Sequence, residues 1–233
     1  DYASAFGYSN EASGLASSAV GFRNKAASEN ASAIGYGNNA NALAASAVGY
    51  NNTAGGVGSS TIGYNNTATN ENASAFGYGN TAGGLASSAF GFSNTASGDN
   101  ANAFGYNNIA SGSKSNVFGT GNTVSGSSST AVGTANEVAA ENSTAIGNNN
   151  TISSSAENSA ALGNNISISL KDSVALGNNS TATAINSVTG NSSYTKWAGV
   201  SDVVGVVSVG SSGATRQIQN VAAGQVSATS TDA

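Results

Sequence analysis

The sequence predicts an all-β solenoid built from a 14-residue repeat that coils around one long axis. Glycine returns every 14 residues from Gly7 to Gly147, then after a step of 16 at Gly163 and after 14 again at Gly177. A large apolar residue precedes each of these glycines, and apolar and polar residues alternate around it, which is typical of strands. We therefore expect about thirteen coils over residues 1–184.

A helix with a 14-residue period is disfavoured. Two or more glycines per repeat would each cost about 1 kcal/mol in a helix. β-branched and aromatic residues, which favour strands, fill the apolar positions. Two short strands joined by two tight turns account for one repeat. Coils stacked about 4.8 Å apart would give a rod about 60 Å long.

The turns are expected at the glycine and at an asparagine three residues after it. Gly and Asn are the residues that tolerate positive φ, which a sharp corner requires. We therefore interpret both as corner residues rather than as ligands for a bound molecule. The asparagines are Asn10, Asn24, Asn38, Asn52, Asn66, Asn80, Asn94, Asn108, Asn122, Asn136 and Asn150.

The large apolar residues before the glycines allow two packing arrangements. In the first, they lie inside the roll and interdigitate with small residues, leaving a flat outer face of Ala, Ser and Gly. In the second, they face partner molecules. A coil this narrow buries little surface by itself, so both arrangements predict self-association. The residues are Phe6, Val20, Ile34, Val48, Ile62, Phe76, Phe90, Phe104, Phe118, Val132, Ile146, Leu162 and Leu176.

Aromatic residues follow the glycine in the first eight repeats and are expected to stack as a ladder. One interpretation is that the ladder stabilises the corner or closes the seam between protomers. The other is an adhesive stripe, since exposed Tyr suits contact with proteins and sugars. The ladder comprises Tyr8, Phe22, Tyr36, Tyr50, Tyr64, Tyr78, Phe92 and Tyr106.

Composition excludes several functions. The six Lys and Arg are scattered, whereas nucleic-acid binding needs them clustered. No apolar run approaches the ~20 residues that span a bilayer. The chain has no His and no Cys, and its acidic residues are well separated. We therefore predict no catalytic residue, no metal site and no cofactor, and no enzyme activity.

The motif Ser-x-Ala-(Ile/Val/Leu/Phe)-Gly, repeated every 14 residues, resembles the heads of trimeric autotransporter adhesins, the YadA-like surface proteins of Gram-negative bacteria. The clear matches are residues 143–147, 159–163 and 173–177, and with the end of the chain the resemblance covers nearly the whole sequence. The resemblance implies a left-handed parallel β-roll and a homotrimer of three rolls side by side. It also implies the extracellular tip of a fibre on the bacterial outer membrane.

The end of the chain is similar to the neck that follows such heads. In this family the neck carries each chain to a neighbour and leads into a coiled-coil stalk, so residues 207–233 are expected to be neck and start of stalk. Thr215 departs from the pattern, where Glu commonly precedes the Arg. The matching residues are Val209, Gly210, Gly213, Arg216, Gln217, Ile218, Asn220, Val221, Ala222, Ala223 and Gly224.

Residues 185–206 fit neither the repeat nor the neck and hold the single tryptophan, Trp197. We expect an inserted hairpin that caps the open end of the solenoid rather than a ligand pocket. No signal peptide precedes the first repeat. The sequence is therefore expected to be a piece of a longer protein, attached to the membrane only through a C-terminal anchor beyond it.

The predicted function is attachment to host extracellular matrix, to host cells or to other bacteria through many weak, repeated contacts. The alternative is a structural spacer in a surface fibre whose adhesive domain lies elsewhere. An ice-binding solenoid is disfavoured, because Glu11, Lys25 and Asn39 interrupt the column of Thr53, Thr67, Thr81 and Thr95.

Overall fold

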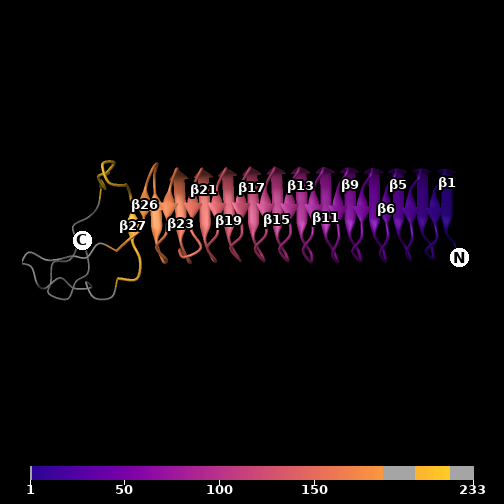
Figure 1. Cartoon of the computed structure of the whole chain (residues 1–233), viewed down its shortest axis with the longest axis horizontal. Helices are drawn as coiled ribbons and strands as arrows, with labels where there is room; N and C mark the ends of the chain where they lie inside the picture. The colour runs from indigo at the N-terminus through magenta and orange to yellow at the C-terminus, as the bar shows by residue number, and fades with distance from the viewer. Residues whose placement is uncertain (1, 186–202, 221–233) are drawn as a thin grey trace, which may run out of the picture.

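The chain winds as a straight β-solenoid, one coil per repeat (Figure 1). The computed structural model describes residues 2–185 and 203–220. A typical coil contains one strand of five residues and one of two, for example β9 (Ser60–Tyr64) and β10 (Thr67–Ala68). All pairing between coils is parallel, and no helix occurs in the described residues. The predicted all-β solenoid is confirmed.

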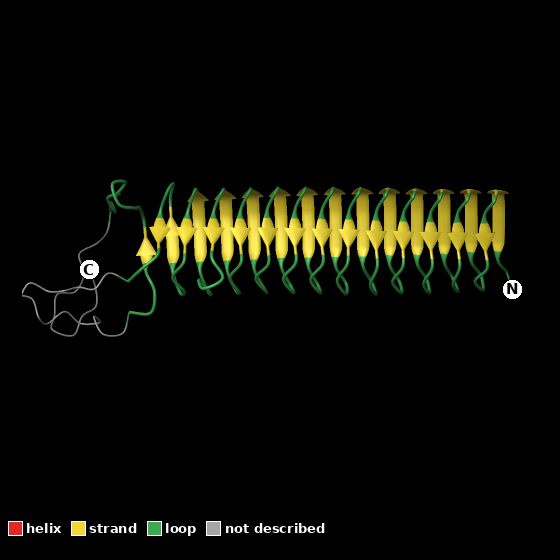
Figure 2. Ribbon diagram, in the orientation of Figure 1, coloured by secondary structure: helices red, strands yellow, loops and turns green. Residues whose placement is uncertain are grey.

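The long strands form one continuous sheet along the rod (Figure 2). They are β1 (Ser4–Tyr8), β3 (Ser18–Phe22), β5 (Ser32–Tyr36), β7 (Ser46–Tyr50), β9 (Ser60–Tyr64), β11 (Ser74–Tyr78), β13 (Ser88–Phe92), β15 (Asn102–Tyr106), β17 (Asn116–Thr120), β19 (Thr130–Thr134), β21 (Thr144–Asn148), β23 (Ala160–Asn164), β25 (Val174–Leu176) and β27 (Val207–Ser208).

The short strands form a second sheet on the other side of the coil. They are β2 (Glu11–Ala12), β4 (Lys25–Ala26), β6 (Asn39–Ala40), β8 (Thr53–Ala54), β10 (Thr67–Ala68), β12 (Thr81–Ala82), β14 (Thr95–Ala96), β16 (Ile109–Ala110), β18 (Thr123–Val124), β20 (Glu137–Val138), β22 (Thr151–Ile152), β24 (Ser167–Ile168) and β26 (Thr181–Ala182).

Register is strict: each residue pairs with its equivalent in the next coil. In β9 and β11, for example, Ile62 pairs with Phe76 and Gly63 with Gly77. The 16-residue step keeps this register, because Gly147 still pairs with Gly163. The two additional residues lie in the turn between β22 and β23.

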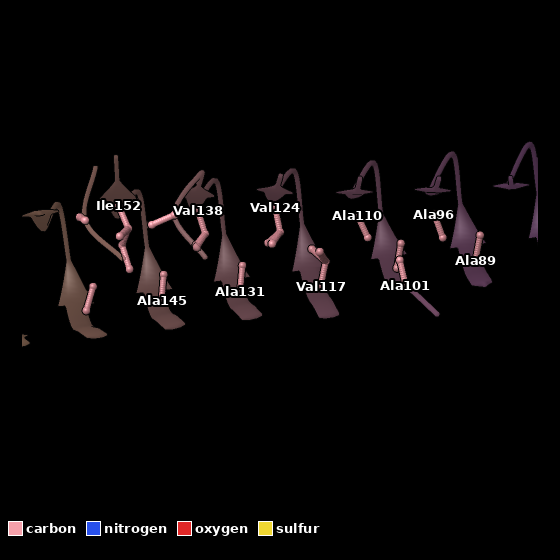
Figure 3. Packing of buried hydrophobic residues seen from close by; sticks show 14 of the residues in the cluster. Ala89, Ala96, Ala101, Ala110, Val117, Val124, Ala131, Val138, Ala145 and Ile152 are labelled. Carbon is pink, nitrogen blue, oxygen red and sulfur yellow. The ribbon is translucent and has the colours of Figure 1, made fainter. Parts of the chain in front are cut away.

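Small side chains from the two sheets meet inside the coil and form the core. Ala89 and Ala103 of long strands and Ala96 and Ala110 of short strands are fully buried. Figure 3 shows the methyl groups of Ala89, Ala96 and Ala110 directed into the space between the sheets. Val and Ile enter the core only from Val117 onward. The interior is therefore filled almost wholly by small residues.

The expectation that the large apolar column lies inside the roll is wrong. Thr61 is fully buried, whereas its neighbour Ile62 is 45% exposed. The cause is the short connection between strands: only two residues separate β9 from β10. This brings the sheets so close that only small side chains fit between them. The second packing arrangement, with the large residues outside, is the one observed.

The repeat glycine lies inside the long strand, not at a corner as expected. At Gly77 φ is +117°, and a Cβ there would lie 2.1 Å from the carbonyl oxygen of Gly91 in the next coil. No side chain can occupy that space, and the φ value is strained for any L residue. Glycine therefore recurs because each coil approaches the next too closely for a Cβ.

The recurring asparagine is also not the corner residue. Positive φ falls on the residue before it, such as Asn65 (φ 54°), and on a second residue in the other turn, such as Asn72 (φ 57°). Asn66 itself is fully buried. Its role is a hydrogen-bonded ladder through the interior.

Each asparagine of this ladder connects three coils. The Asn66 amide donates to the carbonyls of Ile62 at 3.0 Å and Gly77 at 2.7 Å, and lies 3.0 Å from Asn52 Oδ1. Its own Oδ1 accepts from the backbone N–H of Asn80 at 2.9 Å. An amide suits this position because it both donates and accepts. The buried amides of the ladder thereby have hydrogen-bond partners.

We predict that Gly77→Ala lowers the unfolding free energy by about 3 kcal/mol or more, because strain and a backbone clash act together. Gly121→Asn is the matched control, since φ is +63° there and nothing lies within 4 Å of the added Cβ. Urea unfolding followed by far-UV circular dichroism measures both. Equal midpoints for the two variants would contradict the close-approach explanation.

Candidate adhesion and assembly surface

The outward face of the long-strand sheet is uncharged over the whole rod. Alternation places the first, third and fifth residues of each long strand outside, such as Ser60, Ile62 and Tyr64 of β9. None of the long strands from β1 to β25 contains a charged residue. Surfaces this long without charge are unusual on a protein that meets only water.

The residues before the repeat glycines run down the middle of this face, and we call them the apolar column. Most are more than one-third exposed, from 37% at Val20 and Val132 to 53% at Leu162 within the rod and 77% at Phe6 in the first coil. Phe76, Phe90, Phe104 and Phe118 stack on one another, with ring centroids 4.7–5.3 Å apart. The column therefore forms a continuous apolar stripe along the solenoid.

The predicted aromatic ladder forms beside the apolar column, two residues further along each strand. Its eight rings, from Tyr8 to Tyr106, stack with centroids 4.7–5.2 Å apart and interplanar angles of 2–14°. The Arg23 guanidinium adds a cation–π contact, 5.0 Å from the centre of the Phe22 ring. After Tyr106 the same position holds Thr120 and Thr134.

This stacking limits what the ladder can bind. Each inner ring is covered on both faces by its neighbours, so ring faces are not open to a sugar or a second aromatic. Ring edges and hydroxyl groups remain accessible, and Tyr64 is 44% exposed. A partner would contact a row of phenol edges spaced by one coil, which favours an extended surface over a small molecule.

The turns contribute exposed apolar residues that the sequence analysis did not single out. Leu15, Leu43, Val57 and Leu85 each lie eight residues after a repeat glycine and are 43–51% exposed. Glu29 and Glu71 occupy the same position in two of the coils between them. We call residues 15, 29, 43, 57, 71 and 85 the turn column. Its residues are 14 positions apart, so aligning the repeats in the sequence would have identified this column.

The opposite face, formed by the short strands, has a different character. Its outward position holds Thr in most coils, including Thr53, Thr67 and Thr81. At the first two coils Lys25 and Glu11 form an ion pair at 3.1 Å, with both side chains about half exposed. A pair this exposed contributes little to stability. This face is polar and carries charge, unlike the face of the long strands.

The first part of the predicted neck adds one more strand to the solenoid. Strand β27 pairs in parallel with β25, placing Val207 beside Val174. Val174 N–H donates to Val206 O at 2.8 Å, and Thr181 N–H donates to Gly210 O at 2.9 Å. The last coil therefore has hydrogen-bond partners for its outer edge. Residues 186–202, with Trp197 of the predicted cap, and the neck residues 221–224 lie outside the described part of the chain.

Arg216 of the predicted neck covers the last repeat glycine. Its guanidinium carbon lies 3.2 Å from the position of a Cβ on Gly177. Its N–H groups donate to the carbonyls of Val209 at 2.7 Å and Asn178 and lie 3.3 Å from Ser180 Oγ. The arginine thus takes the place that the next coil occupies elsewhere.

A hollow of about 610 Å³ lies beside Arg216 and is lined also by Thr181, Val207 and Thr215. Arg216 is the one titratable residue among its described lining residues, so the hollow offers no acid–base pair. Within residues 2–185 and 203–220, no three His, Cys, Asp or Glu residues gather as metal ligands. That part of the chain also contains no helix long and apolar enough to cross a bilayer.

Comparison with protein families identifies the repeat. The model of the YadA head domain repeat matches residues 1–24, 26–52, 54–80, 82–108, 125–150 and 171–188, well over half of the chain. The chain belongs to the YadA head repeat family. Such repeats build adhesin-type structural domains of surface proteins and are not an enzyme family.

A solved structure of a C-terminal YadA-like domain from Burkholderia pseudomallei is similar to part of this YadA-type head. The two sequences are 28% identical, and the match covers 48% of this chain and 42% of that one, with a TM-score of 0.29. The chain thus spans less than half the length of that relative. Curated protein sequences gave no significant match. Family membership rests on the repeats.

We predict that Arg216→Ala exposes the end of the head without affecting the coils far from it, because each coil contacts only its neighbours. Hydrogen exchange at the Thr181 amide should become roughly tenfold faster, equivalent to about 1.4 kcal/mol. Exchange at the Thr67 amide should not change. Lys171→Ala, which removes a nearby turn cation, is the control. Equal protection of Thr181 in both variants would show that Arg216 does not cap the coil.

Proposed function

We propose that this chain is the head of a homotrimeric bacterial surface adhesin that attaches to host matrix proteins, host cells or other bacteria. The observation that supports it is the uncharged face with its exposed apolar column. A monomer rarely exposes a contiguous apolar patch above a few hundred Å², and such patches mark interfaces. YadA-type heads are typically trimeric adhesins, which agrees with covering this face by identical chains.

Assembly through the apolar column also agrees with the composition of the core. Alanine is the only hydrophobic residue buried in the first eight coils, so each chain buries little apolar surface by itself. Three chains that share the Phe, Val, Ile and Leu side chains at a common axis would obtain a core of normal size. The short-strand faces and turns would then form the outside of the trimer. The site is extracellular, at the tip of a fibre on the outer membrane.

Attachment by such a head depends on repetition rather than on a deep pocket. The rod presents equivalent positions at every coil, and a trimer presents each three times. Weak contacts that repeat along a rigid array gain strength through effective concentration. The alternative function, a spacer that separates another adhesive domain from the cell, requires the same trimer but no affinity for a surface.

We predict that Ile62→Asp combined with Ile146→Asp converts the trimer to single chains, because the variant places carboxylates in an apolar interface. Light scattering after size exclusion measures the mass. Thr67→Asp, on the outward face of the short strands, is the matched control and should stay trimeric. A wild-type mass of one chain would contradict the proposed assembly.

We predict that the wild-type trimer binds immobilised matrix proteins or partner cells. Deletion of residues 1–110, the first eight coils, should reduce binding at least tenfold, since it removes most repeated contacts. Surface plasmon resonance measures binding to the matrix proteins, and flow cytometry measures binding to the cells. Trimeric mass and β content must be retained by the deleted form. Failure of the wild-type trimer to bind any of these surfaces would favour the spacer.

A further inference from the structure

The aromatic ladder and the turn column lie at opposite edges of the uncharged face. Each ladder residue ends its long strand, as Tyr64 ends β9. Each turn residue comes shortly before the next long strand, as Val57 precedes Ser60. Figure 2 shows the turns along one edge of the sheet, with the arrowheads of the long strands at the other edge. The apolar column lies between the two edges.

Both edges change character along the rod in a related way. Leu15, Leu43, Val57 and Leu85 all occur within the coils that carry the ladder. Beyond Leu85, the same turn position holds Asp99, Ser113, Ser127 and Glu141, and the ladder position changes to Thr after Tyr106. The apolar edges are therefore both confined to the N-terminal part of the head.

The side chains at the two edges are chemically complementary. Six of the eight ladder residues are Tyr, whose phenol edges combine an apolar ring with a hydroxyl donor, whereas Phe22 and Phe92 present an apolar edge alone. The turn column holds Leu or Val at four positions and Glu29 and Glu71 at the other two, whose carboxylates can accept from phenol hydroxyls. The Leu and Val side chains of the turn column have no polar atoms, so apolar contact is what they can offer to a ring edge.

A cyclic trimer requires this kind of pairing. Its interfaces are heterologous, so one edge of each chain meets the other edge of the next chain. If the apolar column lies at the axis, the residues on either side of it must face each other across the three seams. The ladder and the turn column are those residues.

We propose that the aromatic ladder of one chain packs against the turn column of the next chain and closes the seam of the trimer along the six turns from Leu15 to Leu85. The proposal rests on the trimer proposed above. Its occupant is a second copy of this chain rather than a host ligand. The hydroxyls of the ladder donate to Glu29 and Glu71 across the seam, and its ring edges contact Leu15, Leu43, Val57 and Leu85.

Chemical crosslinking between copies tests the seam, since the chain has no native cysteine. Two differently tagged chains are co-expressed, one with Tyr64→Cys and one with Val57→Cys. A second pair uses Tyr50→Cys with Val57→Cys. Val57 lies in the chain between Tyr50, which ends β7, and Tyr64, which ends β9, so either ring could face it. A short bis-maleimide should join each mixed pair at least tenfold more than either variant alone. Denaturing gels stained for both tags quantify the product.

Two matched controls separate the seam from the trimer. Ile62→Cys alone should crosslink to itself at the axis and reports on the trimer. Thr67→Cys mixed with Val57→Cys should not crosslink, because Thr67 lies on the opposite sheet. Circular dichroism and light scattering establish that each variant keeps the fold and mass of the wild type.

The outcomes decide between a seam and a free ladder. Crosslinking of the mixed ladder and turn variants supports the seam. Crosslinking of Ile62→Cys without the mixed product overturns the seam while the trimer stands, and leaves the ladder as an adhesive stripe. Self-crosslinking of Tyr64→Cys also overturns it, because the ladder would then meet itself. A mass of one chain overturns both proposals.

Discussion

Strict register is the constraint on which the rest of this structure depends. Strand residues pair with their equivalents in the next coil, so each strand position must be compatible with a copy of itself one strand spacing away. Glycine meets this condition by having no Cβ, as at Gly77 below Gly91. Asparagine meets it by donating to one neighbour and accepting from the other, as Asn66 does. Aromatic rings meet it by stacking.

The same register divides large and small residues between outside and inside. Two-residue corners hold the sheets close together, so the interior accepts methyl groups, buried amides and hydroxyls. Large apolar residues are displaced to the outward face of the long strands. Where the aromatic ladder runs, from Tyr8 to Tyr106, every buried hydrophobic residue of the core is Ala. The stacked rings of the ladder thus add apolar contact between neighbouring coils on the outside, where the alanine core provides little apolar contact inside.

At the ends of the solenoid the last coil has no following coil to pair with, so residues outside the repeat must cover it. At the C-terminal end, β27 pairs with β25, and Arg216 covers Gly177 where a following glycine would lie. Resemblance to the family predicted the neck from its sequence pattern, but not what its arginine contacts. That contact joins residues nearly forty positions apart, and a pattern within one repeat contains no information about it.

The sequence by itself determined the period, the parallel coils, the stacked ladder and the family, because each follows from residues that recur at fixed spacing. Only the tertiary structure decided which strand face is inside, and that the glycine and Asn66 serve close approach and an internal ladder instead of corners. Alternation shows which residues share a face but is symmetric with respect to inside and outside. The distance between the two sheets breaks that symmetry, and it emerges only when the whole coil closes.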